Sequence, residues 1–180
     1  MLLPQPTRRW MKKRRMLRFY SRYIKPGDLC FDIGANRGER SAVFLQLGAV
    51  TVAVEPLARY CTQLSQQYAG QPFTIVNAAV ADVAGTAALM ICDQYDECST
   101  LSEDFKVNYA EGNKLTWTNT TRVAAVTFGG LQQQYGTPAY CKIDVEGMEW
   151  RVLKGMGAPI PFIEFEYNYK MKQEAIGCIQ

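Results

Sequence analysis

The sequence predicts an α/β fold built around a mainly parallel β-sheet. Short apolar segments rich in β-branched residues alternate along the chain with segments of helical periodicity. Such alternation is typical of right-handed βαβ units, whose strands form a parallel sheet. The chain has 180 residues, of which 48% are hydrophobic and 21% charged, as expected for one globular domain with a buried core.

The first expected element is a helix over residues 7–24. Thr7 is a candidate N-cap, Tyr20 and Ile24 recur at helical spacing, and Pro26 ends the helix. Residues 1–27 carry nine basic side chains and no acidic one, whereas the remaining 153 residues carry 11 basic and 17 acidic side chains. We therefore divide the chain into a basic N-terminal helical arm, 1–26, and a domain, 27–180.

Three interpretations of the basic arm stay open. It contacts an anionic surface or a nucleic-acid backbone, it holds an anionic part of a substrate, or it is a solvated helix packed on the acidic body. We favour the last. No apolar run approaches the length of a membrane span, and no apolar segment of a secretory signal follows the basic stretch. A peripheral membrane contact through the arm is compatible with the charge, and the oligomeric state is not predicted.

The remaining elements follow from apolar runs and from the glycine and proline residues between them. Helices are expected at 39–47, 57–68, 131–135, 148–156 and from 172 onward. Strands are expected at 29–34, 51–54, 73–80, 122–127, 139–145 and 162–166, and with a weaker pattern at 87–92. The polar stretch 93–121 is expected to be an irregular excursion over the active face.

Several kinds of chemistry are excluded by composition. The chain contains no histidine, so it has no histidine base, no Ser-His-Asp or Cys-His system and no imidazole metal ligand. Its six cysteines form no C-x-x-C motif. Cys30 and Cys141 lie in apolar runs and are expected to be small buried hydrophobes, which indicates a reducing, cytoplasmic setting.

Three expected strand ends carry residues suited to a ligand, which in parallel sheets binds at the carboxyl ends of strands. After the first strand, Gly34 and Gly38 allow a tight turn and leave room for a ligand against the main chain. Glu55 closes the second strand 21 residues after Gly34, where a carboxylate accepts the hydroxyls of a ribose. Residues 77–82 close the third strand, where an adenine would lie.

The pattern favours S-adenosylmethionine over a nicotinamide or flavin dinucleotide. A dinucleotide site requires G-x-G-x-x-G, but here Asn36 replaces the second glycine. Asp32, two residues before the first glycine, would repel a pyrophosphate. S-adenosylmethionine carries a positive sulfonium and an ammonium group and no phosphate, so it suits this acidic loop.

These motifs together resemble those of the FkbM-type methyltransferase family. Their order and spacing match from about residue 27 to 167, and the most specific motif is K-I-D-V-E-G-x-E followed by L-K-G. The matching runs are FDIGANRG at 31–38, VEP at 54–56, NAAVAD at 77–82 with Gly85, KIDVEGME at 142–149 and LKG at 153–155.

The resemblance implies a Rossmann-like class I methyltransferase fold, a three-layer sandwich, that uses S-adenosylmethionine. Family members typically methylate hydroxyls of sugars or natural products. By position, Asp144 would face the transferred methyl, Glu55 would hold the ribose, and Asn77 and Ala78 would lie near the adenine. The methionine end would be lined by Asp32, Gly34, Asn36 and Gly38.

The chain departs from the family pattern in two places. Phe128-Gly129 stands where members usually carry Leu-Asp, which is expected to loosen the junction between loop and helix. The strand pair that normally completes the class I sheet is not found before Gln180, which suggests an exposed sheet edge.

Transfer of a methyl group to oxygen requires that the acceptor hydroxyl lose its proton. Without histidine, the candidate catalytic residues are Asp144, Glu146 and Lys142, with Glu149 and Glu166 as further candidates for the base. We favour Asp144, because a carboxylate at a strand end lies beside the cofactor. A Mg²⁺ ion held by Asp144 with Glu146 or Glu166 is the less favoured alternative.

The sequence therefore predicts S-adenosylmethionine-dependent O-methylation of a hydroxyl on a sugar or another small-molecule natural product. Two alternatives are retained. The domain binds the cofactor but is inactive because of the absent strand pair, or it methylates nucleic acid with the help of the basic arm. The second is disfavoured because the acidic body would repel a phosphate backbone.

Overall fold

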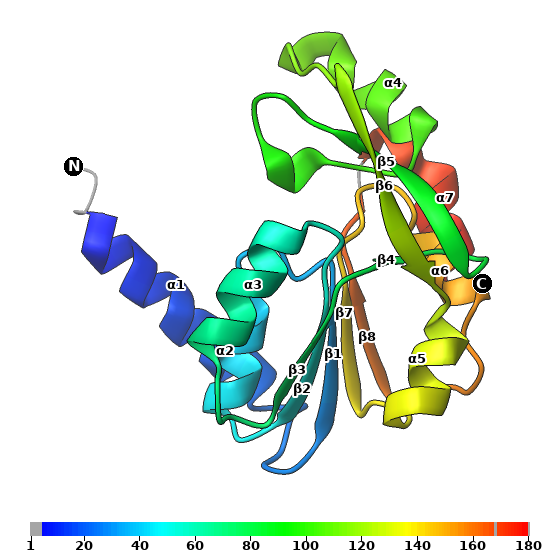
Figure 1. Cartoon of the computed structure of the whole chain (residues 1–180). Coiled ribbons are helices and arrows are strands. Elements are labelled where there is room, and N and C mark those ends of the chain that lie inside the picture. Colours follow the sequence, from blue (N-terminus) through cyan, green and yellow to red (C-terminus); the bar gives the residue numbers. More distant parts are fainter. Residues whose placement is uncertain (1–4, 168, 180) are drawn as a thin grey trace.

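A computed structural model describes residues 5–167 and 169–179, and it describes their side chains except for those of 5–9, 111–113 and 169. Its centre is a five-stranded sheet in the order β3-β2-β1-β7-β8, in which every neighbouring pair is parallel (Figure 1). The strands are β1 (Leu29–Ile33), β2 (Val50–Val54), β3 (Phe73–Val76), β7 (Tyr140–Ile143) and β8 (Phe162–Phe165). The predicted α/β fold with a mainly parallel sheet is confirmed.

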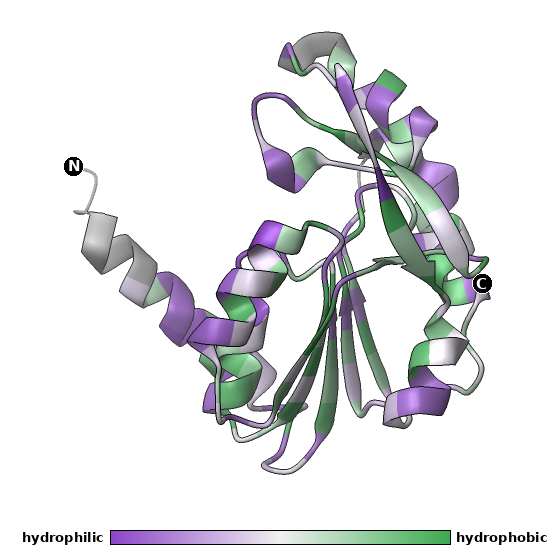
Figure 2. Ribbon diagram, viewed as in Figure 1, coloured by the Kyte–Doolittle hydropathy of each residue, from purple (hydrophilic) through white to green (hydrophobic). Residues whose placement is uncertain are grey.

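Helices cover both faces of this sheet (Figure 1), so the expected three-layer, Rossmann-like sandwich is also confirmed. One face is covered by α1 (Gln5–Tyr20), α2 (Glu39–Gln46) and α3 (Ala58–Gln67), and the other by α5 (Phe128–Tyr135) and α6 (Glu149–Lys154). Successive side chains of β1 point to opposite faces of the sheet. Cys30 packs with Phe44 of α2, whereas Phe31 packs with Phe128 of α5. Figure 2 shows the apolar residues concentrated along these central strands.

The basic helix α1 packs on the body through its C-terminal part. Tyr20 and Ile24 are each only 2% exposed and share a core with Phe44. Lys12 of α1 also forms an ion pair with Glu39 of α2. The helix includes residues 5 and 6, so the expectation that Thr7 is its N-cap is wrong. In the part of α1 that Figure 2 colours, hydrophilic residues are prominent.

The expected strand at 73–80 is two strands in two different sheets. After β3 the chain leaves the main sheet, and β4 (Ala79–Val80) pairs with β6 (Asn119–Val126). The separation occurs at Asn77, whose side-chain amide donates to the carbonyl oxygens of Glu55 and Pro56 at 3.0 and 2.9 Å. Strand β6 also pairs antiparallel with β5 (Gly85–Ile91), which completes a three-stranded second sheet.

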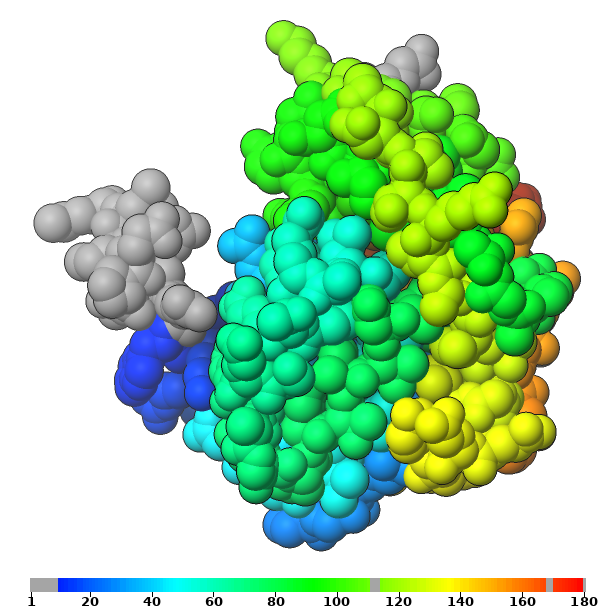
Figure 3. Space-filling view, in the orientation of Figure 1, coloured from blue at the N-terminus to red at the C-terminus, as the bar shows by residue number. Residues whose placement is uncertain are grey.

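The 93–121 segment is more ordered than its polar composition predicts. It contains the short helix η1 (Asp96–Cys98), helix α4 (Glu103–Asn113) and the first residues of β6. Ser102 caps α4, because its hydroxyl accepts a hydrogen bond from the Phe105 N–H at 3.1 Å. Phe105 and Trp117 belong to a separate small core of this segment. In the space-filling view the segment forms the upper part of the molecule, above α3 (Figure 3).

The junction before α5 is tight, so the expectation that Phe128-Gly129 loosens it is wrong. The Thr127 hydroxyl accepts from the Gly130 N–H at 3.1 Å, and the Gly129 N–H donates to the Gly155 carbonyl at 2.7 Å. A Cβ at Gly129 would lie 2.9 Å from that same carbonyl oxygen. The absence of a side chain therefore permits α5 to approach the end of α6 closely.

The chain ends in η2 (Tyr169–Met171) and α7 (Lys172–Ile179), and α7 packs against α6. A Cβ at Gly177 would lie 2.7 Å from the Trp150 ring, which shows how close this contact is. Within the described part of the chain, no strand pairs with the outer edge of β8. The helices of the described residues include none with the length and apolar character to cross a bilayer.

Candidate functional site

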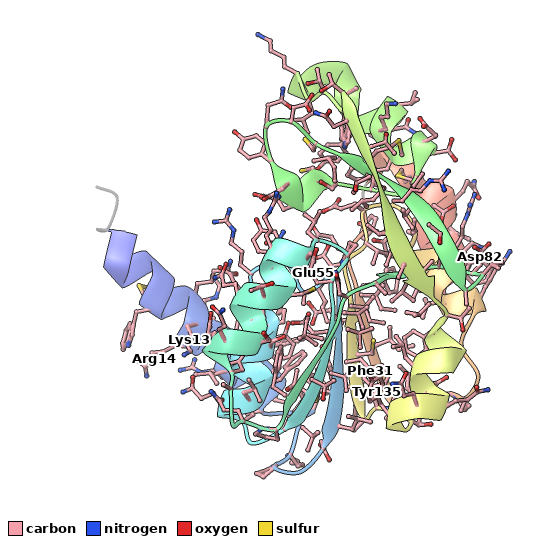
Figure 4. The ribbon with its side chains drawn as sticks, in the orientation of Figure 1. Lys13, Arg14, Phe31, Glu55, Asp82 and Tyr135 are labelled. Carbon is pink, nitrogen blue, oxygen red and sulfur yellow. The ribbon has the colours of Figure 1, made fainter. Side chains whose placement is uncertain are left out.

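A cavity of about 520 Å³ lies at the carboxyl ends of β1, β2 and β7, beneath the 93–121 segment. Figure 4 shows Glu55 at this upper end of the sheet, well above Phe31 in the core. The opposite wall comes from the 93–121 segment and includes Asp96, Ser99 and Thr100. The sequence-based expectation that this segment lies over the strand ends is confirmed for residues 96–101.

The turn after β1 requires glycine at position 34, because the backbone of Asp144, which follows β7, lies against it. Gly34 has a φ of +79°, and a Cβ there would lie 1.7 Å from the Asp144 carbonyl oxygen. Asn36 is also left-handed, with a φ of +47°, and its N–H donates to Glu55 Oε2 at 2.8 Å. Gly34, Asn36 and Asp144 all line the cavity, so the structure brings these predicted site residues together.

Gly38 has a different part in the same loop. It precedes α2 with a φ of +74°, and a Cβ there would lie 2.5 Å from Leu64 Cδ2 of α3. Gly38 is not among the described residues that line the cavity. This glycine therefore permits the close packing of α2 on α3.

Asp32 is a buried carboxylate at the base of the cavity. Its Oδ2 accepts from both the backbone N–H and the hydroxyl of Ser41, at 2.8 and 2.6 Å. Burial raises the pKa of Asp32, although the Ser41 hydrogen bonds oppose this shift. These bonds fix the first turn of α2 over the end of β1.

Glu55 is 4% exposed and has a fixed orientation. Its Oε1 accepts from the Leu57 N–H and its Oε2 from the Asn36 N–H, both at 2.8 Å. Burial raises the pKa of this carboxyl, and the two backbone donors oppose the shift. A carboxylate offers about four acceptor positions, so capacity remains for two hydroxyls of a ligand.

The two residues predicted near an adenine occupy different places. Ala78 is 2% exposed and lines the cavity. Asn77 is exposed and lies outside the lining of the described cavity, since its amide is bonded to the backbone of the β2–α3 connection. Asn77 therefore shapes the loop that follows Glu55.

A row of charged residues crosses the sheet beside the cavity. Asp32, Lys142 and Glu164 are register neighbours on β1, β7 and β8. Lys142 is buried, and its Nζ lies 3.2 Å from Asp144 Oδ2. The Glu164 carboxylate accepts from the hydroxyls of Tyr20 and Tyr140 at 2.8 and 2.9 Å.

Four carboxylates, those of Asp144, Glu146, Glu149 and Glu166, lie in the segments after β7 and β8. Burial, followed by the charges of Asp144, Glu166 and Glu149, raises the pKa of Glu146 to about 8. The pKa of Glu166 is raised chiefly by Asp144, and burial adds to this effect. The Glu146 carbonyl accepts from the Thr100 hydroxyl at 2.6 Å, which joins this turn to the opposite wall. Glu149 is a capping residue, since its carboxylate accepts from the Val145 and Gly147 N–H groups.

Sequence reasoning missed several residues of the cavity wall. Arg37 and Arg40 follow the glycine turn and line the cavity, as does Lys12 of the N-terminal helix. Arg37 lies within the glycine turn and Arg40 in the first turn of α2, and this closeness to the glycine motif was a usable signal for the two arginines. No pattern in the sequence places Lys12 there. Asp96 is held against α3 by hydrogen bonds from Arg59 and Tyr60.

Comparison with known proteins places these motifs in a family. A family model described as "Methyltransferase FkbM domain" matches residues 32–176, a range that contains every predicted site residue. A comparison with curated proteins finds no match. Among solved structures, the chain is similar to one from Clostridium thermocellum described as a "putative rRNA-methylase". That similarity has a TM-score of 0.48 and 8% identity, and it covers 92% of this chain and 76% of that one.

Proposed function

The chain belongs to the FkbM methyltransferase family, and from this premise we propose that it methylates a hydroxyl group with S-adenosylmethionine as the methyl donor. The acceptor we propose is a sugar or another small natural product. The observation that carries the proposal is that two carboxylates, those of Glu55 and Asp144, line the same cavity. Glu55 is fixed by backbone N–H groups at the end of β2, and Asp144 lies at the end of β7 beside the glycine turn.

The charge of the cavity lining suits this cofactor. Its lining is acidic overall, with seven Asp and Glu residues, of which Glu146 is protonated at neutral pH, and four cationic residues. The acids are Asp32, Glu39, Glu55, Asp96, Glu97, Asp144 and Glu146, and the cations are Lys12, Arg37, Arg40 and Lys142. S-adenosylmethionine carries two positive groups and one negative group, so it gains from such a lining, whereas a pyrophosphate would be repelled. When bound, it supplies an electrophilic methyl group.

We assign the residues along the cavity accordingly. Asp32, Gly34 and Asn36 would surround the methionine end, Glu55 would accept the ribose hydroxyls, and Ala78 would lie against the adenine. Gly38 and Asn77 would act indirectly, through the packing of α2 on α3 and the shape of the loop after Glu55.

Asp144 is our candidate for the base that accepts the proton of the acceptor hydroxyl. Its carboxylate is 31% exposed at the cavity, where an acceptor can reach it, and the Lys142 ammonium holds it in place. Glu146, with a pKa of about 8, is protonated at neutral pH and would donate a hydrogen bond there. The described residues contain no group of three or more Asp, Glu or Cys side chains arranged for a metal ion, and no step is assigned to Mg²⁺.

The setting that we propose is a reducing compartment, the cytoplasm. All six cysteines are free thiols. Free thiols persist where disulfides do not form.

The first experiment is calorimetric titration of the protein with S-adenosylmethionine and, separately, with NAD. We expect binding of the first ligand alone. Glu55→Ala should weaken that binding about 10- to 150-fold, as expected for loss of a charge-assisted hydrogen bond of about 1.5–3 kcal/mol. Asp82→Ala is the matched control, because Asp82 is an exposed acid away from the cavity (Figure 4). Equal affinities of the wild type and Glu55→Ala for S-adenosylmethionine would refute the assignment of Glu55 to the cofactor site.

Methyl transfer is tested separately with Asp144→Asn. This variant should bind S-adenosylmethionine as the wild type does and lose transfer to every acceptor that the wild type methylates. Transfer at the wild-type rate would exclude Asp144 as the base. Cofactor binding without transfer to any acceptor by the wild type would favour the inactive-domain alternative. Transfer to RNA alone, with steep salt dependence that deletion of residues 1–25 removes, would favour the nucleic-acid alternative.

A further inference from the structure

We propose that Arg40 is an anion-binding subsite of the cavity and that it binds the carboxylate of the cofactor's methionine portion. This inference rests on the proposed function, which it extends to a residue that neither the family motifs nor the spacing singled out. Arg40 lies in the first turn of α2, is half-buried and lines the cavity on the side of α1.

The guanidinium of Arg40 has donors without acceptors. Its Nε is buried and has no hydrogen-bond partner among the described residues. Its Nη1 donates to the thioether sulfur of Met16 at 3.8 Å, and a thioether is a weak acceptor. Buried polar groups almost always find a partner, so an unpartnered guanidinium at a cavity wall indicates a site for an anionic ligand.

The carboxylates around Arg40 are already engaged by other donors. Glu164, Asp32 and Asp144 act on it electrostatically, but none forms an ion pair with it within 4.0 Å in the described structure. Glu164 accepts hydrogen bonds from two tyrosine hydroxyls, Asp32 accepts from Ser41, and Asp144 forms an ion pair with Lys142. Neutralising these acids therefore does not account for the orientation of Arg40.

The other three cations of the cavity wall have partners. Lys12 is paired with Glu39, and Lys142 is paired with Asp144. Arg37 lies over the ring of Tyr60, 5.8 Å from its centroid. Among the described residues of the lining, Arg40 is thus the cation whose hydrogen-bond partner is only a thioether. One planar guanidinium matches one carboxylate, and the proposed cofactor carries one.

The position of Arg40 fits the methionine end of the cofactor. Glu55, the proposed ribose ligand, lies at the end of β2, whereas two electrostatic neighbours of Arg40, Asp144 and Glu164, lie after β7 and on β8. The glycine turn with Gly34 and Asn36 lies between these two sides. Met16 of α1 contacts the guanidinium directly, so the basic N-terminal helix forms part of the subsite wall.

The test compares S-adenosylmethionine with its decarboxylated analogue, which lacks only the carboxylate. Calorimetry gives the ratio of the two dissociation constants for the wild type and for Arg40→Gln. We expect Arg40→Gln to weaken binding of S-adenosylmethionine about 10- to 100-fold while the analogue changes by no more than about threefold. Arg37→Gln is the matched control, because it removes another cation of the same wall and should leave the ratio unchanged.

Two further results would overturn the proposal. Equal weakening of both ligands by Arg40→Gln would mean that the residue only supports the structure of the cavity, and no weakening of either would mean that the carboxylate lies elsewhere. Arg40→Lys keeps a cation and should retain part of the preference, provided that its thermal unfolding matches the wild type. Failure of the wild type to bind either ligand would instead refute the proposed function itself, and this inference with it.

Discussion

Replacing Glu146 by glutamine removes a carboxylate whose ionisation the folded protein opposes. Burial and the charges of Asp144, Glu166 and Glu149 raise the pKa of Glu146 from 4.5 to about 8. Between those two values the folded state keeps a proton that the unfolded state has released. The contribution of Glu146 to stability is therefore lost as pH rises from about 4.5 to 8.

The size of the effect follows from the shift. One pKa unit corresponds to about 1.4 kcal/mol, so a shift from 4.5 to about 8 sets a ceiling of about 5 kcal/mol. Glu146 is partly accessible to solvent, which screens the charge, and we expect about 1–3 kcal/mol. Glutamine has no proton to lose in this range, so the stability of Glu146→Gln relative to the wild type should grow with pH and level off above about pH 8.

The assay is urea unfolding followed by tryptophan fluorescence, at intervals from pH 5 to pH 9. Glu97→Gln is the control, since it removes an exposed carboxylate from the opposite wall of the same cavity. The measured quantity is the free energy of unfolding of each variant minus that of the wild type at the same pH. A difference for Glu146→Gln that stays constant, or that shrinks as pH rises, would refute the reasoning.

Two other changes test the contacts that build the cavity. Gly34→Ala should lower the free energy of unfolding by more than about 3 kcal/mol, because its Cβ would lie 1.7 Å from the Asp144 carbonyl oxygen. Gly70→Ala, with a similar φ of +76° and open space around it, should cost only about 1–2 kcal/mol for the left-handed backbone, and equal costs would contradict this account. Thr100→Val removes the hydroxyl that joins the 93–121 segment to the Glu146 carbonyl and should cost about 1–2 kcal/mol in urea unfolding. An unchanged unfolding midpoint for Thr100→Val would show that this hydrogen bond does not secure the wall.

The sequence predicted the elements that rest on strong local signals. The apolar run at β1 and the glycine turn after it predicted both the first strand and a loop that lines the cavity, because such a turn has few structural alternatives. Glu55 was predicted at the cavity since a carboxylate closing the second parallel strand must lie at the same edge as that turn.

The parts that were not predicted depend on contacts between distant residues. The break between β3 and β4 depends on the side chain of Asn77 reaching the backbone after β2, which no local pattern within 73–80 reveals. Helix α4 lies in a polar stretch with a narrow apolar face that packs on its own small core. The contact of Arg40 with Met16, 24 residues earlier in the chain, depends on the packing of α1, which no local pattern around Arg40 reveals.

The two walls of the cavity differ in how firmly they are attached, and this bears on specificity. The register of β1 with β7 places Gly34 against Asp144, and the Asp144 N–H donates to the Ile33 carbonyl at 2.9 Å. The glycine turn and Asp144, the proposed base, are therefore one unit of the central sheet. The wall at residues 96–101 is held to this unit through side chains, chiefly Asp96 against α3 and Thr100 against the turn after β7. Because few hydrogen bonds cross between the walls, substitutions at 96–101 should change which acceptor is methylated while cofactor binding is retained.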